Sequence, residues 1–406
     1  MKLLERTEYL NRLLEVKGTP DIKVITGIRR CGKSVLMKEF IKILERDFRN
    51  SNILFINLQE LENENLREYR ALHSYIIDHH EQEKENILIV DEIQLCKDFE
   101  LAINSIHAKG IFDIYLTGSN AFLLSSDLAT LFTGRSMQIS VFPFSFKEYL
   151  EYNDDSGNSL NASFDEYARN GGMSGSYLYG NSADRTNYLK DLYETVLLRD
   201  LVKKYNIRNA SELRKISDFM IGNTANLLSP NNICTELNKD GSSITNKTVS
   251  KYISYLCNAF LFYEAARFDI KGKKQLSSNS KFYIVDSGFR YSILGTRNMD
   301  YGHIYEGIVY LELLRRGYEV YVGKLYKKEI DFVAVRNSEK LYIQVSDNIT
   351  SEETLNRELL PLKAIHDSYP KLLLARTFHE KYDIEGIAIQ DLATWLASDL
   401  AISSTL

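Results

Sequence analysis

The stretch Gly27-Ile28-Arg29-Arg30-Cys31-Gly32-Lys33-Ser34 lies between an apolar run, residues 22–26, and a helical pattern that starts at Val35. Its spacing, Gly-x-x-x-x-Gly-Lys-Ser, is typical of a P-loop, in which a strand delivers a loop whose backbone N–H groups surround a phosphate. Glycine permits the turn and the close approach, and the following helix directs its positive end at the phosphates. Lys33 would reach the β- and γ-phosphates, and the Ser34 hydroxyl would ligate a Mg²⁺ ion held by the same oxygens. We therefore expect residues 27–35 to bind a nucleotide.

The composition limits what kind of protein this is. At 406 residues the chain is too long for one ordinary core, which indicates two or three domains. No apolar run approaches the roughly 20 residues that span a bilayer, and the first ten residues lack the apolar segment of a signal peptide. We therefore expect a cytoplasmic protein without a membrane partner. Because the formal net charge is −5, any contact with nucleic acid must come from a local basic patch.

The cysteines are scattered along the chain and form no Cys-x-x-Cys pair. They are Cys31, Cys96, Cys234 and Cys257. This spacing favours reduced, structural thiols over a zinc site or a disulfide framework. Cys31 lies inside the P-loop, so its oxidation would affect nucleotide binding.

A second half of a nucleotide site follows the apolar run 87–90, which ends in Asp91-Glu92. A carboxylate at the end of a strand can hold the water shell of Mg²⁺, and a neighbouring one can orient or deprotonate the attacking water. We therefore assign Asp91 to the metal and Glu92 to the base. The alternative is a solvated Asp-Glu pair at the start of a helix.

Further along, candidate phosphate sensors follow the strand expected at 112–116. Ser119 and Asn120 would lie at the tip of a strand between the P-loop strand and the acidic strand, within reach of the γ-phosphate or the lytic water. A simple Gly-Ser-Asn turn is the alternative. Arg135 could sense the γ-phosphate in cis or across a subunit boundary, or form a surface ion pair instead.

Several segments together carry a family resemblance. They are residues 27–34, 87–94, 116–120, 131–135, 142–149, 171–173 and 193–200. These segments resemble the AAA-type ATPases of archaea and bacteria whose C-terminal half is a domain of uncharacterised function. The resemblance covers nearly the whole chain and implies ATP binding and hydrolysis with Mg²⁺. It is compatible with association with DNA and implies no defined cellular task.

The middle of the chain indicates a winged helix. Residues 151–163 are polar and predict a linker, and 184–205 predict a long helix that carries Arg199, a weak candidate for a trans-acting arginine. From about 212 to 285 the pattern is helix, helix, turn, helix and two strands, typical of a winged helix-turn-helix. The lysines that would contact DNA phosphates are Lys247, Lys251, Lys271, Lys273 and Lys274. A protein–protein hinge is the alternative.

The C-terminal segment has the element order αβββαββ from residue 303 onward, which resembles the restriction-endonuclease-like, PD-(D/E)XK, fold. In that family an aspartate, a Glu-x-Lys triplet and often a helix glutamate form a Mg²⁺ site. Asp331 and Glu306 match the aspartate and the glutamate, whereas Gln344 and Ser346 stand where a carboxylate and a lysine belong. We expect a vestigial nuclease site, unless a nearby lysine substitutes. The candidates for that lysine are Lys340, Lys327 and Lys328.

The expected fold class is α/β, in three parts. A P-loop parallel sheet with helices on both faces occupies 1–150, a helical and winged-helix segment 151–290, and a small restriction-endonuclease-like α/β domain 291–406. Three functions compete: an ATPase associated with double-stranded DNA, a nucleotide-gated protein–protein switch with slow turnover, and an ATP-regulated nuclease. The partner would be DNA, a second copy of the chain or another protein.

Overall fold

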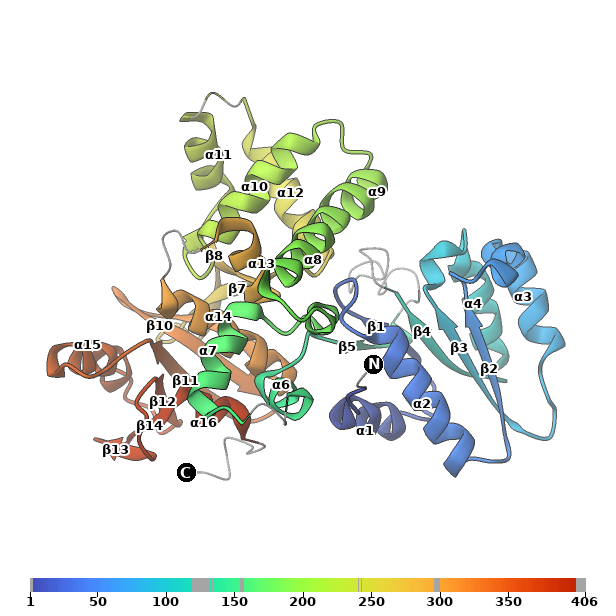
Figure 1. Ribbon diagram of the computed structural model, residues 1–406, viewed down its shortest axis with the longest axis horizontal. Helices are drawn as coiled ribbons and strands as arrows, with labels where there is room; N and C mark the ends of the chain where they lie inside the picture. The colour runs from blue at the N-terminus through green and yellow to red at the C-terminus, as the bar shows by residue number, and fades with distance from the viewer. Residues whose placement is uncertain are drawn as a thin grey trace. The chain divides into compact units, whose positions relative to one another are not determined.

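The computed structural model describes residues 3–118, 132, 134–153, 157–239, 241, 243–295 and 300–398. The chain divides into two compact units (Figure 1). Unit 1 comprises Met1–Pro143 with Asn258–Phe260, and unit 2 comprises Phe144–Cys257 with Leu261–Leu406. Within the described ranges, no helix is both long enough and apolar enough to cross a membrane.

Unit 1 is built on a five-stranded parallel sheet in the order β2-β3-β4-β1-β5. The strands are β1 (Ile22–Thr26), β2 (Ser51–Asn57), β3 (Glu85–Asp91), β4 (Asp113–Thr117) and β5 (Ser136–Ser140). The helices are α1 (Thr7–Glu15), α2 (Lys33–Asp47), α3 (Tyr69–Asp78) and α4 (Phe99–Lys109), with short 3₁₀ turns at Leu61–Arg67 and Ile93–Leu95. This confirms the expected P-loop architecture, including the placement of β4 between the P-loop strand and the acidic strand.

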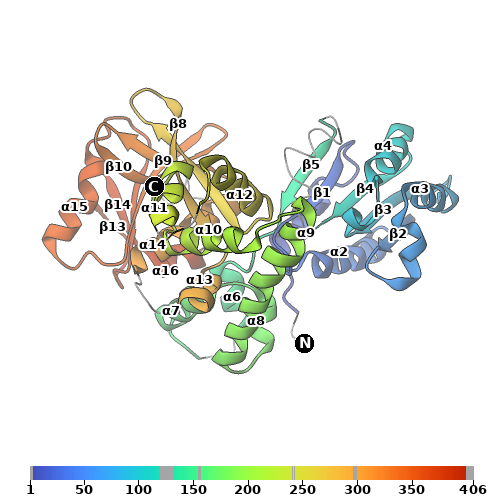
Figure 2. The ribbon, with the colours of Figure 1, turned by 90° about the horizontal axis from the view of Figure 1, so that it is seen from above.

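Helices cover both faces of this sheet because the strands are apolar on both sides (Figure 2). On one face, Val24, Leu88 and Leu116 belong to a buried cluster that includes residues of α3 and α4. On the other face, Tyr115 meets Phe40 of α2, with ring centroids 5.1 Å apart. The sheet is therefore a rigid layer from which the loops at its edges project.

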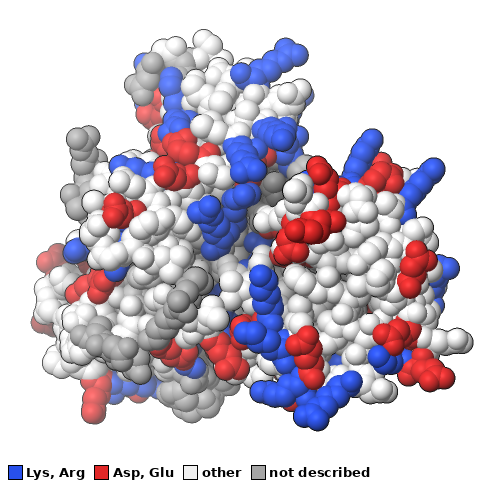
Figure 3. All heavy atoms as spheres, turned by 45° about the vertical axis from the view of Figure 1, so that its right-hand side comes forward, with Lys and Arg blue, Asp and Glu red and all other residues white. Residues whose placement is uncertain are grey.

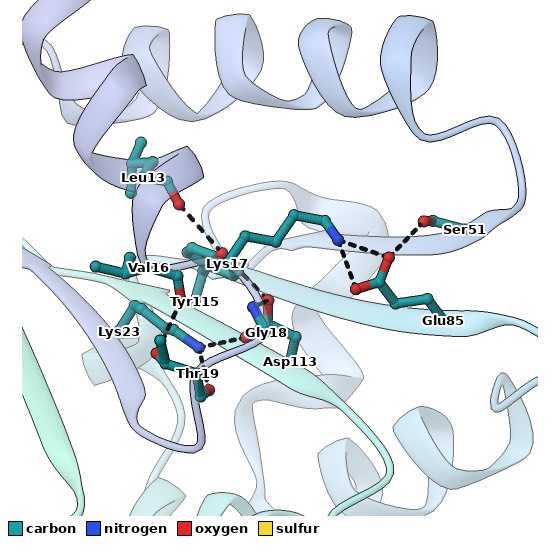
Figure 4. Close-up of polar contacts among 10 residues, drawn as sticks. All are labelled: Leu13, Val16, Lys17, Gly18, Thr19, Lys23, Ser51, Glu85, Asp113 and Tyr115. Atoms are coloured by element: carbon teal, nitrogen blue, oxygen red, sulfur yellow. Dashed lines mark hydrogen bonds and ion pairs between the residues drawn. The ribbon is translucent and has the colours of Figure 1, made fainter.

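A polar network closes the amino-terminal edge of the sheet (Figure 4). The Lys23 side chain is fully buried, and its ammonium donates to Asp113 Oδ1 at 2.5 Å and to the Thr19 carbonyl at 2.6 Å. Asp113 Oδ2 also accepts from the backbone N–H of Gly18 at 2.9 Å. These bonds fix the loop between α1 and β1, and hence the start of the strand that delivers the P-loop.

Unit 2 contains a nine-stranded sheet in the order β13-β14-β12-β11-β10-β9-β7-β8-β6, counted over its described residues. Its strands are β6 (Leu227–Leu228), β7 (Phe262–Asp269), β8 (Lys274–Ile284), β9 (Glu319–Leu325), β10 (Lys328–Arg336), β11 (Glu339–Ser346), β12 (Lys371–Ala375), β13 (Tyr382–Ile384) and β14 (Ile387–Asp391). Its helices are α6 (Phe146–Tyr152), α7 (Leu160–Asn170), α8 (Ser182–Glu194), α9 (Lys203–Tyr205), α10 (Ala210–Gly222), α11 (Pro230–Lys239), α12 (Asn246–Asn258), α13 (Ser287–Leu294), α14 (Tyr301–Arg315), α15 (Glu352–Lys363) and α16 (Leu392–Ala397), with a 3₁₀ turn at Ser174–Leu178. The expected αβββαββ order is confirmed, with β13 as an additional short strand.

The expected boundary at residue 290 is wrong, because strands on both sides of it share this sheet. β7 pairs in parallel with β9, so that Asp269 lies opposite Lys324, and the Ile270 N–H donates to the Lys324 carbonyl at 3.0 Å. The hairpin of β7 and β8 is therefore part of the C-terminal sheet. The first long segment of unit 1 ends at Pro143 rather than at residue 150.

Helices also pack on both faces of the larger sheet. Leu359 and Leu362 of α15 join a buried cluster with strand residues of β10 to β14. From α14, Tyr310 stacks on Tyr283 of β8 at 4.2 Å and contacts Phe332 of β10 at 5.9 Å. α14 therefore packs against β8 and β10.

A buried carboxyl lies against the glycines at 171 and 172. Asp286 accepts hydrogen bonds from the backbone N–H groups of Gly172, at 2.5 Å, and of Gly288, at 2.9 Å. A Cβ on Gly171, whose φ is +74°, would lie 1.8 Å from Asp286 Oδ1. Burial raises the pKa of Asp286 to about 7, although these N–H groups oppose the shift. This motif therefore serves packing within unit 2.

The long helix expected at 184–205 is present as a continuous helical run with an irregular centre. α8 passes into a π-helical segment, Thr195–Val202, and then into α9. Arg199 is exposed on the π-helical segment, next to Leu198.

Candidate functional site

The P-loop joins β1 to α2 with the backbone geometry that its glycines permit. Gly27 has a φ of +143°, and a Cβ there would lie 2.1 Å from the Val141 carbonyl oxygen. Gly32, with a φ of +102°, immediately precedes α2. A side chain is sterically excluded at Gly27 and would be strained by the backbone at Gly32, so both positions favour glycine.

Two basic side chains hold this loop. The Lys33 ammonium is buried and donates to the carbonyls of Gly27, at 2.8 Å, and Ile28, at 3.0 Å. Arg6, which precedes α1, is also buried, and its guanidinium donates to the Cys31 carbonyl at 3.2 Å. Arg6 lies over the ring of Tyr9 at 4.4 Å. The segment before β1 therefore contacts the P-loop directly.

The carboxyl ends of β3 and β4 place Asp91 beside Thr117 at the same edge. Val24 is in register with Leu116, and Leu116 with Val90, so the three strands end side by side. The Thr117 hydroxyl donates to Asp91 Oδ1 and accepts from the Glu92 N–H, the latter at 3.2 Å. Asp91 is 2 % exposed and Thr117 is fully buried.

Glu92 is held in an unusual conformation directly after β3. Its φ of +57° and ψ of +46° lie in the left-handed region, which is uncommon for a residue with a side chain. The Gln94 side-chain amide donates to Glu92 Oε2. Such outliers persist only where the surrounding structure imposes them, and they are frequent at functional sites.

Of the candidate phosphate sensors, the structure describes only Arg135, which lies away from the P-loop. Ser119 and Asn120 lie outside the described residues. Arg135 is exposed, and its carbonyl accepts from the Ile22 N–H at 2.9 Å. Because β5 begins at Ser136 and runs parallel to β1, Arg135 lies at the amino-terminal edge, one full strand of about 16 Å from the P-loop. The hypothesis that Arg135 senses the phosphate in cis is therefore wrong.

Sequence reasoning missed three residues of the site. Thr117 directly follows the strand expected at 112–116, and a hydroxyl at the end of a strand next to the acidic strand is a signal that could have found it. Gln94 follows Glu92 by two residues on a short turn, so its closeness in the sequence is a signal that could have found the contact between their side chains. Arg6 had no such signal, since it lies 25 positions before the carbonyl that it contacts.

The vestigial-site residues of unit 2 also come together, but around a lysine. Glu306 and Asp331 are buried near Lys281 of β8, whose ammonium lies 2.8 Å from Glu306 Oε1 and 3.8 Å from Asp331 Oδ1. The Gln344 side-chain oxygen accepts from the Asp331 N–H at 3.3 Å. The Ser346 hydroxyl donates to the Asn348 carbonyl at 3.0 Å.

The lysines expected to substitute in this site have other surroundings. Lys340 lies over the rings of Tyr342 and Tyr369 and 3.9 Å from Asp367, away from Asp331. Lys327 is exposed, and the Lys328 ammonium donates to the Leu360 carbonyl at 3.4 Å. The lysine of the cluster comes instead from β8, a strand that the sequence assigned to another domain. Among the groups that the structure describes, no three His, Cys, Asp or Glu residues are placed to hold a metal ion.

The basic residues of the expected winged helix are exposed on two separate elements. Lys247 and Lys251 lie one turn apart on the exposed face of α12, opposite the buried Val249 and Ile253. Lys271, Lys273 and Lys274 lie at the turn between β7 and β8, where Asp269 Oδ1 accepts from the N–H groups of Lys271 and Gly272, both at 3.1 Å. The Lys271 ammonium lies over Tyr326 at 4.8 Å. Figure 3 shows basic and acidic side chains interspersed over the face that it draws.

Comparison with family models finds two matches in the chain. Residues 19–150 match a model described as an AAA domain, and residues 161–300 match a domain of unknown function. An uncharacterised protein of Haemophilus influenzae is 35 % identical over 398 residues, which is 97 % of this chain and 98 % of that protein. The chain belongs to the same family as this Haemophilus protein, and its residues 19–150 match the AAA-domain model.

Other similar proteins have a lower sequence identity to this chain. An uncharacterised protein of Methanocaldococcus jannaschii is 28 % identical over 90 % of this chain and 84 % of its own length. The Aeropyrum pernix ORC1 protein in complex with DNA gives a TM-score of 0.31 at 11 % identity, covering 78 % of this chain and 94 % of that one. DnaA of Aquifex aeolicus bound to AMPPCP gives 0.30 at 14 % identity, covering 61 % and 85 %.

Proposed function

We propose that unit 1 binds ATP with Mg²⁺ and hydrolyses it, and that unit 2 associates with double-stranded DNA. One observation carries the ATPase proposal. The carboxyl edge of the parallel sheet brings together the P-loop, Asp91 and Glu92, and Thr117 links the two carboxylate-bearing residues. A phosphate-binding loop beside a buried carboxylate and a second acid is the arrangement that phosphoryl transfer to water requires.

The residues of the loop fit a nucleotide and its metal. Phosphate oxygens would replace the carbonyls of Gly27 and Ile28 as partners of the Lys33 ammonium. The Ser34 hydroxyl and the Asp91 carboxylate offer the oxygen ligands that Mg²⁺ prefers. When bound, ATP supplies the phosphoanhydride that is cleaved, and Mg²⁺ neutralises charge on its oxygens.

Glu92 would act as the general base on the attacking water. Its left-handed backbone and the hydrogen bond from Gln94 fix where the carboxylate lies. Ser119 and Asn120 remain the proposed sensors of the γ-phosphate. Arg135, at the opposite edge of the sheet, would act only on a nucleotide bound by a neighbouring copy, which implies a homo-oligomer.

The DNA proposal depends on the order α10-β6-α11-α12-β7-β8 and on the antiparallel pairing of β6 with β8. This order is typical of a winged helix-turn-helix in which α12 is the recognition helix. Lys247 and Lys251 would contact phosphates, and the lysines of the β7–β8 turn would act as the wing.

Replacing Lys247 and Lys251 together with alanine tests this interface. We expect weaker binding to duplex DNA, because each lost phosphate contact removes a released counterion. The slope of log K against log salt should become shallower by about 2. Fluorescence anisotropy at several salt concentrations measures both quantities. Lys363→Ala, which removes a partly exposed lysine of α15 paired with Glu385, is the control. An unchanged slope in the double variant would remove α12 from the interface.

The function itself is tested by measuring ATP hydrolysis with and without duplex DNA, followed by inspection of the DNA for cleavage. Mg²⁺-dependent hydrolysis that DNA stimulates, with the DNA intact, is the expected result. Slow turnover that ignores DNA, together with a change of oligomeric state on adding ATP, would favour the nucleotide-gated switch. Cleavage of the DNA would favour the regulated nuclease.

A further inference from the structure

A row of aromatic rings crosses one face of the large sheet beside α15. A buried cluster that includes residues of α15 covers part of this face, and Phe268 of β7 and Tyr321 of β9 pack against that cluster. Both rings are half-buried, and their centroids lie 5.7 Å apart. Tyr321 is in register with Val333, and Val333 with Tyr342, so the side chain of Tyr342 on β11 lies on the same face.

A lysine lies among these rings. The Lys340 ammonium lies over Phe268 at 5.5 Å, over Tyr342 at 4.9 Å and over Tyr369 at 5.0 Å. Tyr369, which precedes β12, is 42 % exposed. Asp367 Oδ2 accepts from the Tyr342 hydroxyl at 2.6 Å and lies 3.9 Å from the Lys340 ammonium. This separation is too long for a hydrogen bond, so Lys340 donates none to Asp367.

The turn between β7 and β8 brings further lysines beside these rings. Lys271 and Lys273 are exposed on this turn, and the Lys271 ammonium lies over Tyr326, which is 66 % exposed. Burial lowers the pKa of Lys340, Asp367 opposes that shift, and the positive charge of Lys273 adds to it. The ammonium groups of Lys273 and Lys340 therefore repel each other, and an anion between them would stabilise both.

The carboxylates beside these lysines accept hydrogen bonds from other groups. They are Asp269, whose Oδ1 accepts from two backbone N–H groups at 3.1 Å, Glu319, which accepts from the Tyr321 hydroxyl at 3.0 Å, and Asp367. The lysines of this surface outnumber these acids. They are Lys271, Lys273, Lys274, Lys340 and Lys371. A surface of this charge suits a polyanion.

We propose that this ring-and-lysine surface binds single-stranded DNA, with bases stacked on Tyr369 and Tyr326 and phosphates held by the lysines around them. Exposed rings beside a basic track hold single strands because every base has a face that can stack. A duplex keeps its bases stacked on one another, so these rings favour a single strand. The choice of DNA over RNA rests on the proposed association of unit 2 with DNA.

Two substitutions outside the β7–β8 turn test this surface, because the lysines of that turn are also proposed to contact duplex DNA. The probe is a labelled oligothymidine of about 15 nucleotides, and fluorescence anisotropy measures its binding to nucleotide-free protein. We expect Tyr369→Ala to bind about tenfold more weakly, since one base loses its stacking partner. Lys340→Ala should bind more weakly too, and the slope of log K against log salt should become shallower by about 0.7.

Matched variants separate stacking from changes in the fold. Tyr369→Phe keeps the ring and should bind oligothymidine like the wild type. Tyr382→Ala removes a tyrosine of β13 that is 38 % exposed, and it should also bind like the wild type. Lys363→Ala, which removes a partly exposed lysine of α15, is the control for Lys340→Ala.

A duplex probe separates this inference from the proposed duplex interface. Tyr369→Ala should bind a DNA hairpin like the wild type, whereas Lys247→Ala/Lys251→Ala should lose affinity for the hairpin and keep its affinity for oligothymidine. The inference would be overturned by a wild type that does not bind oligothymidine, or by equal binding of oligothymidine to Tyr369→Ala and wild type. Tighter binding of oligouridine than of oligothymidine would assign the surface to RNA and overturn the choice of DNA.

Discussion

Glu92→Gln is expected to lower the rate of ATP hydrolysis by about two to four orders of magnitude, the usual contribution of a general base. An amide occupies the same space and can keep the hydrogen bond from Gln94, but it accepts no proton. The affinity for ATP should stay close to that of the wild type, because Glu92 lies beyond the P-loop and contacts no phosphate in the proposed arrangement. Steady-state hydrolysis and equilibrium binding of ATP measure the two effects separately.

Asp98→Asn is the matched control for this substitution. Asp98 is exposed in the same connection between β3 and α4, and it also has a positive φ, of 54°. Asparagine tolerates this conformation, so the backbone should not change. Hydrolysis by Asp98→Asn should match the wild type. If Glu92→Gln hydrolyses ATP at the parent rate, the assignment of the base is wrong.

Lys23→Met is expected to destabilise unit 1 by about 3–5 kcal/mol, the cost of breaking a buried ion pair. The Lys23 and Asp113 side chains are 0 % and 7 % exposed, so Asp113 would remain buried without its main cationic partner. The bond to the Thr19 carbonyl would be lost as well, which releases the loop before β1. Urea unfolding followed by circular dichroism measures the change in the free energy of unfolding.

Two comparisons make this stability prediction specific. Arg12→Met removes the exposed pair with Glu15 in the same unit and should cost about 1 kcal/mol or less. Lys23→Met/Asp113→Leu removes both charges and should recover much of the loss, because a well-packed apolar pair often replaces a buried ion pair without penalty. A loss in Lys23→Met no larger than in Arg12→Met would show that the buried pair contributes little.

Much of unit 1 could be predicted from the sequence because its signals are local. The P-loop spacing requires a strand before it and a helix after it, and the apolar run ending at Asp91 requires a buried parallel strand. Together they imply an α/β sheet, and the expected position of β4 between the two functional strands is confirmed. The position of Arg135 was harder to predict, because the sequence does not say at which edge of the sheet a loop residue lies.

Unit 2 was less predictable because its organisation depends on contacts between distant segments. The strands β7 and β8 carry an ordinary hairpin pattern, and nothing local indicates that β7 pairs with β9, more than 50 residues later. The burial of Lys281 could not be predicted for the same reason. A lysine in a strand normally faces solvent, and only the approach of α14 and β10 buries this one among carboxylates.

The central claim is that the loop at residues 27–34 holds the phosphates of ATP, and calorimetric titration of Mg-ATP into wild type and Lys33→Ala tests it most directly. We expect the wild type to bind ATP and Lys33→Ala to bind it about 100-fold more weakly, since a charge-assisted contact is lost. Lys38→Ala, an exposed lysine of the same helix, should bind like the wild type. Equal affinity of Lys33→Ala and wild type for ATP would contradict the assignment of this loop to the phosphates.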